Sequence, residues 1–459
     1  MRLHPLSSAT VDDIIAAARL GGMTSLAVCD VDTGEFLEVK NPVRRLPPAS
    51  VVKSLTALYA LDMLGADYRF VTRLVATGPI EDGLIKGDLV LVGSGDPTLD
   101  TDALGDMARA LAQNGVRRIG GRLLLAPGAL PFVPAIEPGQ PPQAGYNPAI
   151  SGLNLNFNRV YFEWQRQAEG YRVTLDARAE RFRPEVRIAR MQVVDRELPV
   201  YTYADQGGSD QWTVARPALG NGGGRWLPVR KPARYVGEVF RSLAAAQGVS
   251  LPEPEITDHA PPGETLFAWQ SGELRGILRG MLHWSTNLTA EVVGLTASRA
   301  RGRSPVSLAD SAASMEAWAR ERLVLRRPRF IDHSGLGDGA RLCASDLVTA
   351  LRHPLARAQL APLLRRMSMR DSNGLPMPDS PIEVHAKTGT LNFVSALAGY
   401  VATPSGRRLA FAIISADLER RAALRPEERE RPEGGRAWTL RARRMQNELL
   451  ARWGSIFAA

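Results

Sequence analysis

The sequence predicts an α+β fold in which a helix-and-sheet domain is interrupted by a long β-rich insertion. The chain begins with helical and strand-like segments and ends with strands and a helix, whereas residues 71–256 have the texture of short strands and loops. A length of 459 residues suits about two or three domains. We therefore expect a discontinuous domain over residues 1–72 and 265–459, and an inserted region over 73–264 that forms two small subdomains.

The N-terminal part of the discontinuous domain predicts a helix, a hairpin and a second, longer helix. Thr10 is suited to cap the first helix, and Ser50 stands at the beginning of the second. In chain order we expect a helix over 11–20, strands over 24–31 and 36–39 joined by the turn Asp32-Thr33-Gly34-Glu35, and an apolar helix over 50–65.

The insertion and the C-terminal part differ in periodicity. In the insertion we expect strands over 89–92, 122–125, 160–164 and 171–175, a long surface loop rich in Pro and Gly over 127–148, and a flexible segment over 220–224. After it we expect helices over 274–282, 289–299 and 308–323, strands over 382–386, 395–401 and 409–415, and a final helix over 437–453. The charged run from Glu419 to Arg431 is expected to be a solvated loop.

Composition excludes several classes of protein. Hydrophobic residues make up 44% and charged residues 23% of the chain, as in ordinary globular proteins, which argues against fibrous and disordered classes. The longest apolar runs, such as Leu409 to Ile414, are far shorter than the roughly 18 to 20 residues of a membrane-spanning helix. We therefore expect membrane association to be peripheral at most. Residues 1–10 lack the apolar core of a signal peptide.

The net charge of +9 comes from 57 basic residues, of which only five are lysine. A basic surface can bind nucleic acid, but no zinc-finger, RNA-binding or helix-turn-helix pattern accompanies it, so we expect no nucleic-acid partner. Cys29 and Cys343 lie in apolar stretches, without a spacing that suits metal or redox chemistry. Both are expected to be buried thiols, and no metal or other cofactor is expected.

The first chemically informative motif is Ser50-Val51-Val52-Lys53. Serine and lysine three residues apart lie on one face of a helix, so a neutral lysine amine can take the hydroxyl proton. The alternative is a helix-capping serine followed by a surface lysine, because this pattern arises often by chance.

Two further motifs lie in the C-terminal part. Ser285-Thr286-Asn287 follows an apolar helix and offers a hydroxyl and an amide, although a plain capping turn explains it equally well. Lys387-Thr388-Gly389-Thr390 lies inside an apolar strand. A buried ammonium there needs a polar partner, because an unpaired one is costly; the alternative is an exposed lysine on an edge strand.

Taken together, S-x-x-K, S-x-N and K-T-G in this order form the set found in penicillin-binding proteins and serine β-lactamases. The chain resembles the class C low-molecular-mass penicillin-binding proteins, the D-alanyl-D-alanine carboxypeptidase/endopeptidase family. The resemblance extends to Gly95-Asp96-Pro97-Thr98-Leu99, to Asp332 with Ser334-Gly335-Leu336, and to Ala398-Gly399-Tyr400. His333 departs from it, since such proteins commonly have glycine at that position.

The resemblance implies a catalytic domain like that of penicillin-binding proteins and serine β-lactamases, with an antiparallel sheet flanked by helices. It implies Ser50 as the nucleophile, Lys53 as the general base and Ser285 as a proton relay to the leaving amine. The substrate-binding residues it implies are Asn287, Lys387, Thr388, Gly389 and Thr390. The backbone N–H groups of Ser50 and Thr390 would form the oxyanion hole.

The same resemblance implies the partners and the location. The substrates would be peptidoglycan peptides that end in D-Ala-D-Ala, and β-lactams would be acylating inhibitors. No metal is required by this chemistry. Because peptidoglycan lies outside the cytoplasmic membrane, a periplasmic or otherwise extracytoplasmic location is implied.

Several alternatives stay open at this point. A β-lactamase or esterase would use the same serine and lysine, although no E-x-x-L-N segment is present to activate water. A non-catalytic muropeptide-binding protein would be expected if one motif had decayed, and none has. The sequence does not separate carboxypeptidase from endopeptidase preference. A triad built on Asp332, His333 and Ser334 is not favoured, since consecutive residues do not readily face one another.

Overall fold

The computed structural model describes residues 9–371, 374–425 and 428–458. Contacts divide the chain into two compact units. The first unit comprises Met1–Ala66, Leu278–Ala290 and Ala297–Ala459, and the second comprises Asp67–Ile277 and Glu291–Thr296. Each unit is described by itself below.

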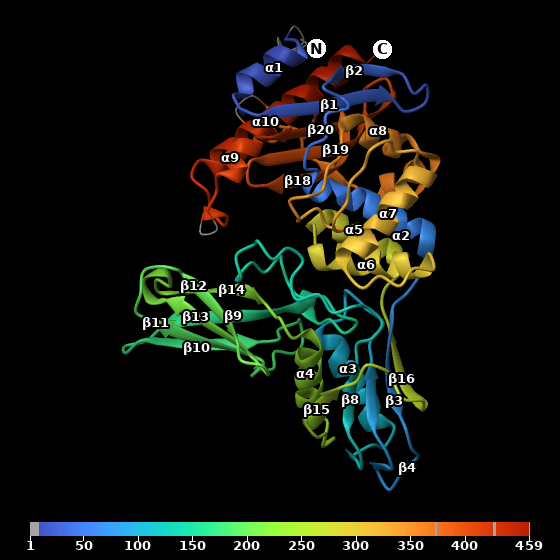
Figure 1. Cartoon of the computed structure of the whole chain (residues 1–459), viewed down its shortest axis with the longest axis vertical. Helices are drawn as coiled ribbons and strands as arrows, with labels where there is room; N and C mark the ends of the chain where they lie inside the picture. The colour runs from blue at the N-terminus through green and yellow to red at the C-terminus, as the bar shows by residue number, and fades with distance from the viewer. Residues whose placement is uncertain (1–8, 372–373, 426–427, 459) are drawn as a thin grey trace. The chain divides into compact units, whose positions relative to one another are not determined.

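The first unit is built on a six-stranded antiparallel sheet, in which strands from both ends of the chain lie side by side (Figure 1). Its strands, in spatial order, are β17 (Arg365–Met367), β18 (Glu383–Leu391), β19 (Val394–Ala402), β20 (Arg408–Ala416), β1 (Met23–Asp30) and β2 (Phe36–Lys40). The predicted strands and the N-terminal hairpin are confirmed, with boundaries shifted by a few residues.

The two faces of this sheet differ in side-chain size. One face carries large residues such as Val28 and Phe411, which pack with Trp438 and Trp453 of α10 (Gly435–Ile456). The other face carries small residues, because directly paired residues of an antiparallel sheet point to the same side. Ala27, Ala412, Ala398 and Lys387 are paired across four strands and therefore share that face. Small side chains let a neighbouring element approach the sheet closely beside Lys387.

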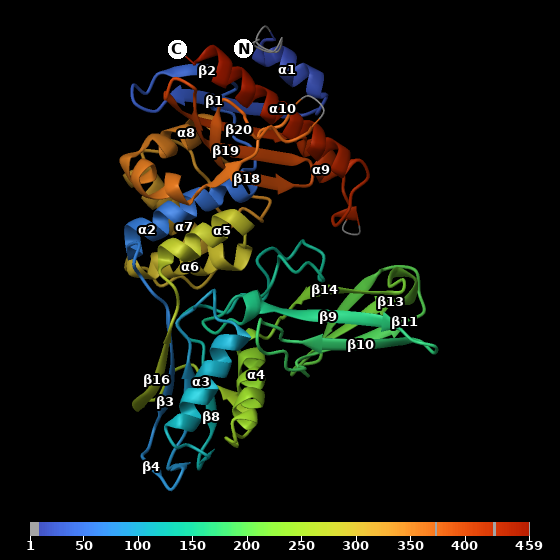
Figure 2. The same cartoon turned by 180° about the vertical axis from the view of Figure 1, so that it is seen from behind.

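The remaining helices of the first unit flank the sheet (Figures 1 and 2). They are α1 (Val11–Ala18), α2 (Val52–Leu64), α7 (Leu308–Arg322), α8 (Ala344–Arg352) and α9 (Leu418–Ala422), together with α5 (Leu274–Trp284) and α6 (Asn287–Ala300), which are divided between the units. Thr10 caps α1 as predicted. Helix α2 is buried on nearly all sides, from Val52 to Leu61, so it forms the centre of this unit rather than an amphipathic surface helix.

The second unit contains a five-stranded sheet, three three-stranded sheets and two helices. The large sheet has the order β15 (Pro254–Ile256), β8 (Leu123–Ala126), β6 (Leu89–Val92), β3 (Val71–Ala76) and β16 (Glu264–Gln270). The small sheets contain β4 (Ile80–Glu81), β5 (Leu84–Ile85) and β7 (Arg118–Ile119); β10 (Tyr171–Asp176), β9 (Arg159–Arg166) and β14 (Gly222–Pro228); and β11 (Ala189–Val194), β13 (Asp210–Ala215) and β12 (Tyr201–Asp205). One hydrophobic cluster in this unit contains buried residues from Leu74 to Leu251 in the sequence.

Four α-helices were missed by the sequence analysis: α3 (Thr101–Gln113), α4 (Pro232–Ala246), α8, and α9, which lies in the charged run expected to be a loop. In α3 the apolar residues are interrupted by Gly105, which disfavours a helix by propensity alone. The structure explains this glycine, because a Cβ at Gly105 would lie 2.5 Å from the ring of Phe182. Tertiary packing therefore overrides the local preference.

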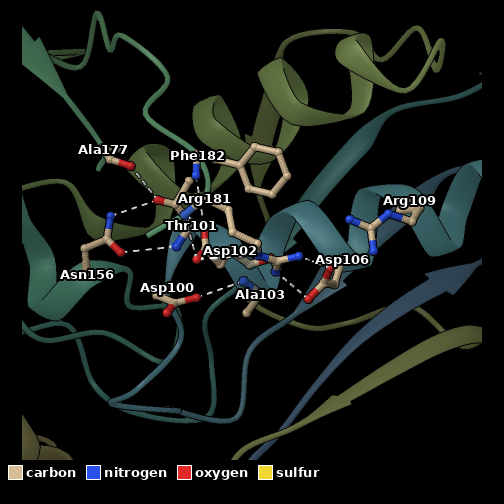
Figure 3. Close-up of polar contacts among 10 residues, drawn as sticks. All are labelled: Asp100, Thr101, Asp102, Ala103, Asp106, Arg109, Asn156, Ala177, Arg181 and Phe182. Atoms are coloured by element: carbon tan, nitrogen blue, oxygen red, sulfur yellow. Dashed lines mark hydrogen bonds and ion pairs between the residues drawn. The ribbon is translucent and has the colours of Figure 1, made fainter. Parts of the chain in front are cut away.

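A loop around Phe182 is held on the first turn of α3 by acidic side chains (Figure 3). The carboxylate of Asp102 accepts hydrogen bonds from the backbone N–H groups of Arg181 and Phe182, at 3.1 Å each. The guanidinium of Arg181 reaches Asp106 one turn later, at 2.7 Å. These contacts fasten the loop that follows β10 to the helix.

The expectation of a flexible segment over 220–224 was wrong. Gly222–Gly224 form the first part of β14 and pair with β9. A Cβ at Gly223 would lie 2.7 Å from the Trp164 ring, and one at Gly224 would lie 2.2 Å from the Tyr161 hydroxyl. The glycines therefore make room for aromatic side chains of the neighbouring strand, a reason that is not visible in the sequence.

The segment 127–148 contains no helix or strand, as expected, but it is not simply a surface loop. Leu130, Ile136 and Ala144 within it are buried. Both cysteines are buried and free, as predicted. Within the described residues, no helix combines the length and the apolar character needed to cross a bilayer.

Candidate active site

Ser50 lies in a short 3-10 turn, Ala49–Val51, that leads directly into α2. The helix predicted from residue 50 is therefore a regular α-helix only from Val52. Ala49, which precedes the serine, has a φ of 46°, a left-handed conformation that costs energy for a residue with a Cβ. Such a conformation persists only where neighbouring structure enforces it.

Lys53 is fully buried and its amino group contacts three separate segments. Its Nζ donates hydrogen bonds to Ser50 Oγ at 2.9 Å, to Asn287 Oδ1 at 2.7 Å and to the carbonyl of Ser334 at 2.7 Å. The alternative of a capping serine with a surface lysine is therefore wrong. The hydroxyl of a half-buried serine lies within hydrogen-bond reach of a desolvated amine, which is the arrangement that activates a serine.

The Ser334 carbonyl is supplied by a loop that the carboxylate of Asp332 folds. Asp332 accepts hydrogen bonds from the backbone N–H groups of Gly335 and Gly337, at 2.7 Å each. Gly335 has a φ of 74°, and a Cβ there would lie 2.0 Å from the carbonyl oxygen of Ala49. The loop thus packs against the strained residue that precedes Ser50.

The second motif faces both lysines. Ser285 lies between α5 and α6 with a φ of 59°, and its Oγ accepts a hydrogen bond from Lys387 Nζ at 3.0 Å. Asn287 is the first residue of α6 and contacts Lys53 instead. The turn is therefore more than a cap, because each of its polar side chains contacts a different lysine.

Lys387 lies on the small-residue face of β18 and is almost completely buried. Besides Ser285, its Nζ reaches the carbonyl of Thr388 at 2.7 Å. Burial, and then the positive charge of Arg365 on β17, lower the pKa of Lys387 to about 8. The alternative of an exposed edge-strand lysine is wrong.

The end of β18 lies beside Ser50. A Cβ at Gly389 would lie 3.0 Å from the backbone nitrogen of Ser50, so the strand and the 3-10 turn touch at this glycine. Thr388 and Thr390 are exposed on the opposite face. Strand β17 pairs with β18 only over Val384–Ala386, so in the described part of the chain the stretch from Thr388 to Leu391 has a neighbouring strand on one side only. An extended peptide can bind along such an edge.

All eight residues predicted for the site lie in the first unit, in the turn of α2, the α5–α6 turn and β18. Hydrogen bonds join Ser50, Lys53 and Asn287 in one group and Ser285, Lys387 and the Thr388 carbonyl in another. The sequence analysis missed the Ser334 carbonyl and the charge of Arg365. The pattern Asp332-x-x-Gly335 could have indicated a tight turn, but not its contact with Lys53.

His333 belongs to this loop, and its side chain is buried and takes no part in a triad. Its Nε2 is 2.7 Å from Ser311 Oγ, and its carbonyl accepts a hydrogen bond from Thr56 at 2.7 Å. Burial lowers the pKa of His333 to about 3, so the imidazole is neutral at physiological pH. Lys53 and Thr56, one turn apart on α2, thus bind the carbonyls of consecutive residues of the loop.

Substitution of Gly335 by alanine is expected to lower the free energy of unfolding by about 2 kcal/mol or more, because the new Cβ meets the Ala49 carbonyl in a left-handed conformation. Chemical denaturation at neutral pH measures this. Gly280→Ala in α5 is the matched control, since its Cβ would meet no atom within 4 Å. This substitution should leave the free energy of unfolding unchanged or raise it. Equal stability of the two variants would contradict the packing described.

The buried imidazole predicts a dependence of stability on pH. The folded pKa of His333 lies below the unfolded value of about 6.5, so its stabilising contribution is complete above pH 6.5 and is lost as pH falls toward about 3. Between pH 7 and pH 5 the wild type should lose about 2 kcal/mol more unfolding free energy than His333→Gln. Urea denaturation at both pH values compares them, and an equal loss in both proteins would refute the assignment.

Comparison with known proteins identifies the family. The model of the D-Ala-D-Ala carboxypeptidase 3 (S13) family matches residues 7–431. The D-alanyl-D-alanine carboxypeptidase of Actinomadura sp. (strain R39) is 28% identical over 450 residues, covering 86% of this chain and 78% of that protein. The crystal structure of penicillin-binding protein 4 from Haemophilus influenzae has a TM-score of 0.75 at 19% identity, covering 92% of this chain and 98% of that one.

A second structure of the Haemophilus influenzae protein, complexed with a β-lactam, has a TM-score of 0.71 at 19% identity and covers the same shares of the two chains. These structural likenesses confirm the predicted α+β fold, and the family match confirms the predicted serine D-Ala-D-Ala carboxypeptidase class. This chain, with its Ser50–Lys53 pair and its buried Lys387, belongs to the D-Ala-D-Ala carboxypeptidase 3 (S13) family.

Proposed function

We propose that this enzyme cleaves the D-Ala-D-Ala bond of peptidoglycan stem peptides through an acyl-enzyme on Ser50. The contact of 2.9 Å between Ser50 Oγ and the buried amine of Lys53 carries the proposal. A serine hydroxyl is a weak nucleophile unless an adjacent base takes its proton, and Lys53 is the base within reach.

The reaction proceeds in two steps. Ser50 Oγ attacks the carbonyl carbon between the two D-alanines while its proton passes to the neutral amine of Lys53. The tetrahedral intermediate then collapses, the C–N bond breaks, and the terminal D-alanine leaves after its nitrogen has received a proton. Water next attacks the ester, so that the shortened peptide leaves as a carboxylic acid and Ser50 regains its proton.

The residues around Ser50 can supply the proton and the hydrogen bonds that this reaction needs. Ser285, half-buried and hydrogen-bonded to Lys387, serves as the relay that delivers a proton to the leaving amine. Asn287, whose Oδ1 contacts Lys53, has an amide N–H group that can bind a substrate carbonyl. The backbone N–H groups of Ser50 and Thr390 serve as the oxyanion hole, and the closeness of Gly389 to the Ser50 nitrogen supports this assignment.

In this proposal the terminal carboxylate of the substrate is bound by Lys387 together with the hydroxyl of Thr388 or Thr390. Lys387 is held in place by Ser285 and the Thr388 carbonyl, which supports a role as a fixed cation. A carboxylate is thereby recognised at the open end of β18.

The same proposal covers inhibitors, domain roles and location. β-Lactams acylate Ser50, in line with the β-lactam complex of the Haemophilus influenzae protein.

Residues 1–72 and 265–459 act as the catalytic domain, and residues 73–264 act as an inserted region. The two compact units support this division, because their boundaries lie close to these residues. The enzyme works in the periplasm or elsewhere outside the cytoplasmic membrane, where its substrate is found.

Replacement of Ser50 by alanine should abolish acylation by benzylpenicillin. Intact-mass analysis after brief and long exposure, with peptide mapping, is expected to find one penicilloyl group on Ser50 in the wild type and none in the variant. Ser54→Ala is the matched control, because Ser54 lies on the same helix and its buried hydroxyl has no hydrogen-bond partner among the described residues. Lys53→Ala should slow acylation by about 10²- to 10⁴-fold.

An adduct on another serine, or acylation of Ser50→Ala at the wild-type rate, would overturn the nucleophile assignment. A short-lived adduct with rapid turnover of the drug would instead favour a β-lactamase.

The charge of Lys387 predicts the alkaline limb of the pH profile. Because its pKa is lowered to about 8, kcat/KM for a peptide ending in D-Ala-D-Ala should fall as pH rises through about 8, where the ammonium loses its charge. Arg365→Gln removes a neighbouring positive charge and should move this limb to higher pH. The corresponding C-terminal amide, which has no carboxylate, is the control substrate. A limb that stays in place in Arg365→Gln would contradict the role of Arg365.

A further inference from the structure

The charged run over residues 419–431, expected to be a solvated loop, contains a side chain that is largely buried. Its first part is helix α9, which begins where β20 ends. Arg421 on this helix is 14% exposed, whereas Arg425 in the same run is 76% exposed. The run is therefore not uniformly solvated.

The guanidinium of Arg421 joins two segments that are far apart in sequence. Its Nη1 donates a hydrogen bond to the carbonyl of Asn392 at 2.9 Å. Its Nη2 forms an ion pair with the carboxylate of Asp338. A planar guanidinium can hold two acceptors in fixed directions, which a lysine amine does less well.

The first of these segments is the strained turn at the end of β18. Leu391 and Val394 are paired, so Asn392 and Phe393 form a two-residue turn, and Phe393 has a φ of 57°. The segment around α9 holds this turn at two further points. The backbone N–H of Asp417 donates to the Phe393 carbonyl at 2.9 Å, and the Arg420 guanidinium lies 4.3 Å from the centre of the Phe393 ring.

The second segment is the loop that holds Lys53. Asp338 follows directly on Gly337, the last residue bonded to the Asp332 carboxylate. The same loop supplies the Ser334 carbonyl to Lys53 and packs Gly335 against Ala49. On the other side, Thr390 of β18 is two residues before Asn392 in the sequence. Arg421 therefore ties the strand end that flanks Ser50 to the loop that supports its base.

We propose that Arg421 is a positioning residue for the reaction of Ser50, acting through Asn392 and Asp338. It fixes the separation between the Thr390 N–H donor and the Ser50–Lys53 pair, and it touches neither substrate nor reacting atoms. An error of about 1 Å in such a separation can cost about a hundredfold in rate. This inference rests on the proposed function. One of its tests, hydrogen exchange, does not depend on enzyme activity.

The experiment compares Arg421→Met with Arg425→Met, an exposed arginine of the same run whose ion pair is with Glu428. With a peptide ending in D-Ala-D-Ala, Arg421→Met should lower kcat by at least about tenfold while KM changes less than about twofold. Arg425→Met should match the wild type. Arg421→Lys should recover part of kcat, because an amine can reach one of the two acceptors.

Hydrogen exchange supplies the readout that is independent of activity. Peptides spanning 388–394 and 333–338 should exchange faster in Arg421→Met, with the remainder of the first unit unchanged. Asp338→Asn removes the charge of the exposed partner of Arg421 and should produce the same local change. This variant replaces Arg421→Met in the test if Arg421→Met folds poorly. Combining the two substitutions should have little more effect than Arg421→Met alone.

The outcomes separate the two proposals. If the wild type forms no penicilloyl adduct and cleaves no peptide, the proposed function fails, and unchanged exchange at both loops would also overturn the role of Arg421. If the wild type is active and folded Arg421→Met has the same kcat, the positioning role is overturned while the proposed function stands. A uniform rise in exchange over the whole unit would show general destabilisation and would also overturn it.

Discussion

The burial of one lysine is the constraint on which the first unit depends. The Lys53 amino group lies on a helix that is buried on nearly all sides, so its hydrogen bonds must be made inside the protein. Ser50, Asn287 and the Ser334 carbonyl provide them. Asn287 and Ser334 each lie more than two hundred residues from Lys53 in sequence, and the requirement of one amine brings them to a single point beside Ser50. Ser50 is thereby held beside Lys53.

Close approach of the backbone completes the arrangement. Small residues on one face of the six-stranded sheet, with Gly389 at its contact point, let the turn at Ser50 lie against β18. Gly335 packs against the Ala49 carbonyl of the same turn. Two non-glycine residues with positive φ lie in the site, Ala49 in this turn and Ser285 in the α5–α6 turn. Strain of this kind gathers where surrounding structure fixes a catalytic geometry, and here it lies next to the nucleophile and within the second motif.

The two lysines of the site differ in their surroundings, and the difference suits two tasks. Lys53 contacts a serine hydroxyl and can exchange a proton with it. Lys387 contacts Ser285 and a backbone carbonyl, near the positive charge of Arg365, and in the proposed function it binds the carboxylate of the substrate. The arginine-rich composition first raised the question of a nucleic-acid partner. Some of these arginines connect loops, as Arg421 does between Asn392 and Asp338. A high net charge by itself therefore says little about partners.

The sequence by itself determined the α+β class, the longer strands and most of the helices of the first unit, and the residues of the three motifs, because hydrophobic periodicity and short-range spacing are local properties. Ser50 and Lys53 could be paired from the sequence, since three residues along a helix fix their relation. Only the tertiary structure decided that Asn287 contacts Lys53 while Ser285 contacts Lys387, that Gly222–Gly224 form a strand beneath aromatic rings, and that the Arg421 side chain is largely shielded from solvent. Each of these depends on contacts between residues distant in sequence, and such contacts leave no period or spacing in the chain.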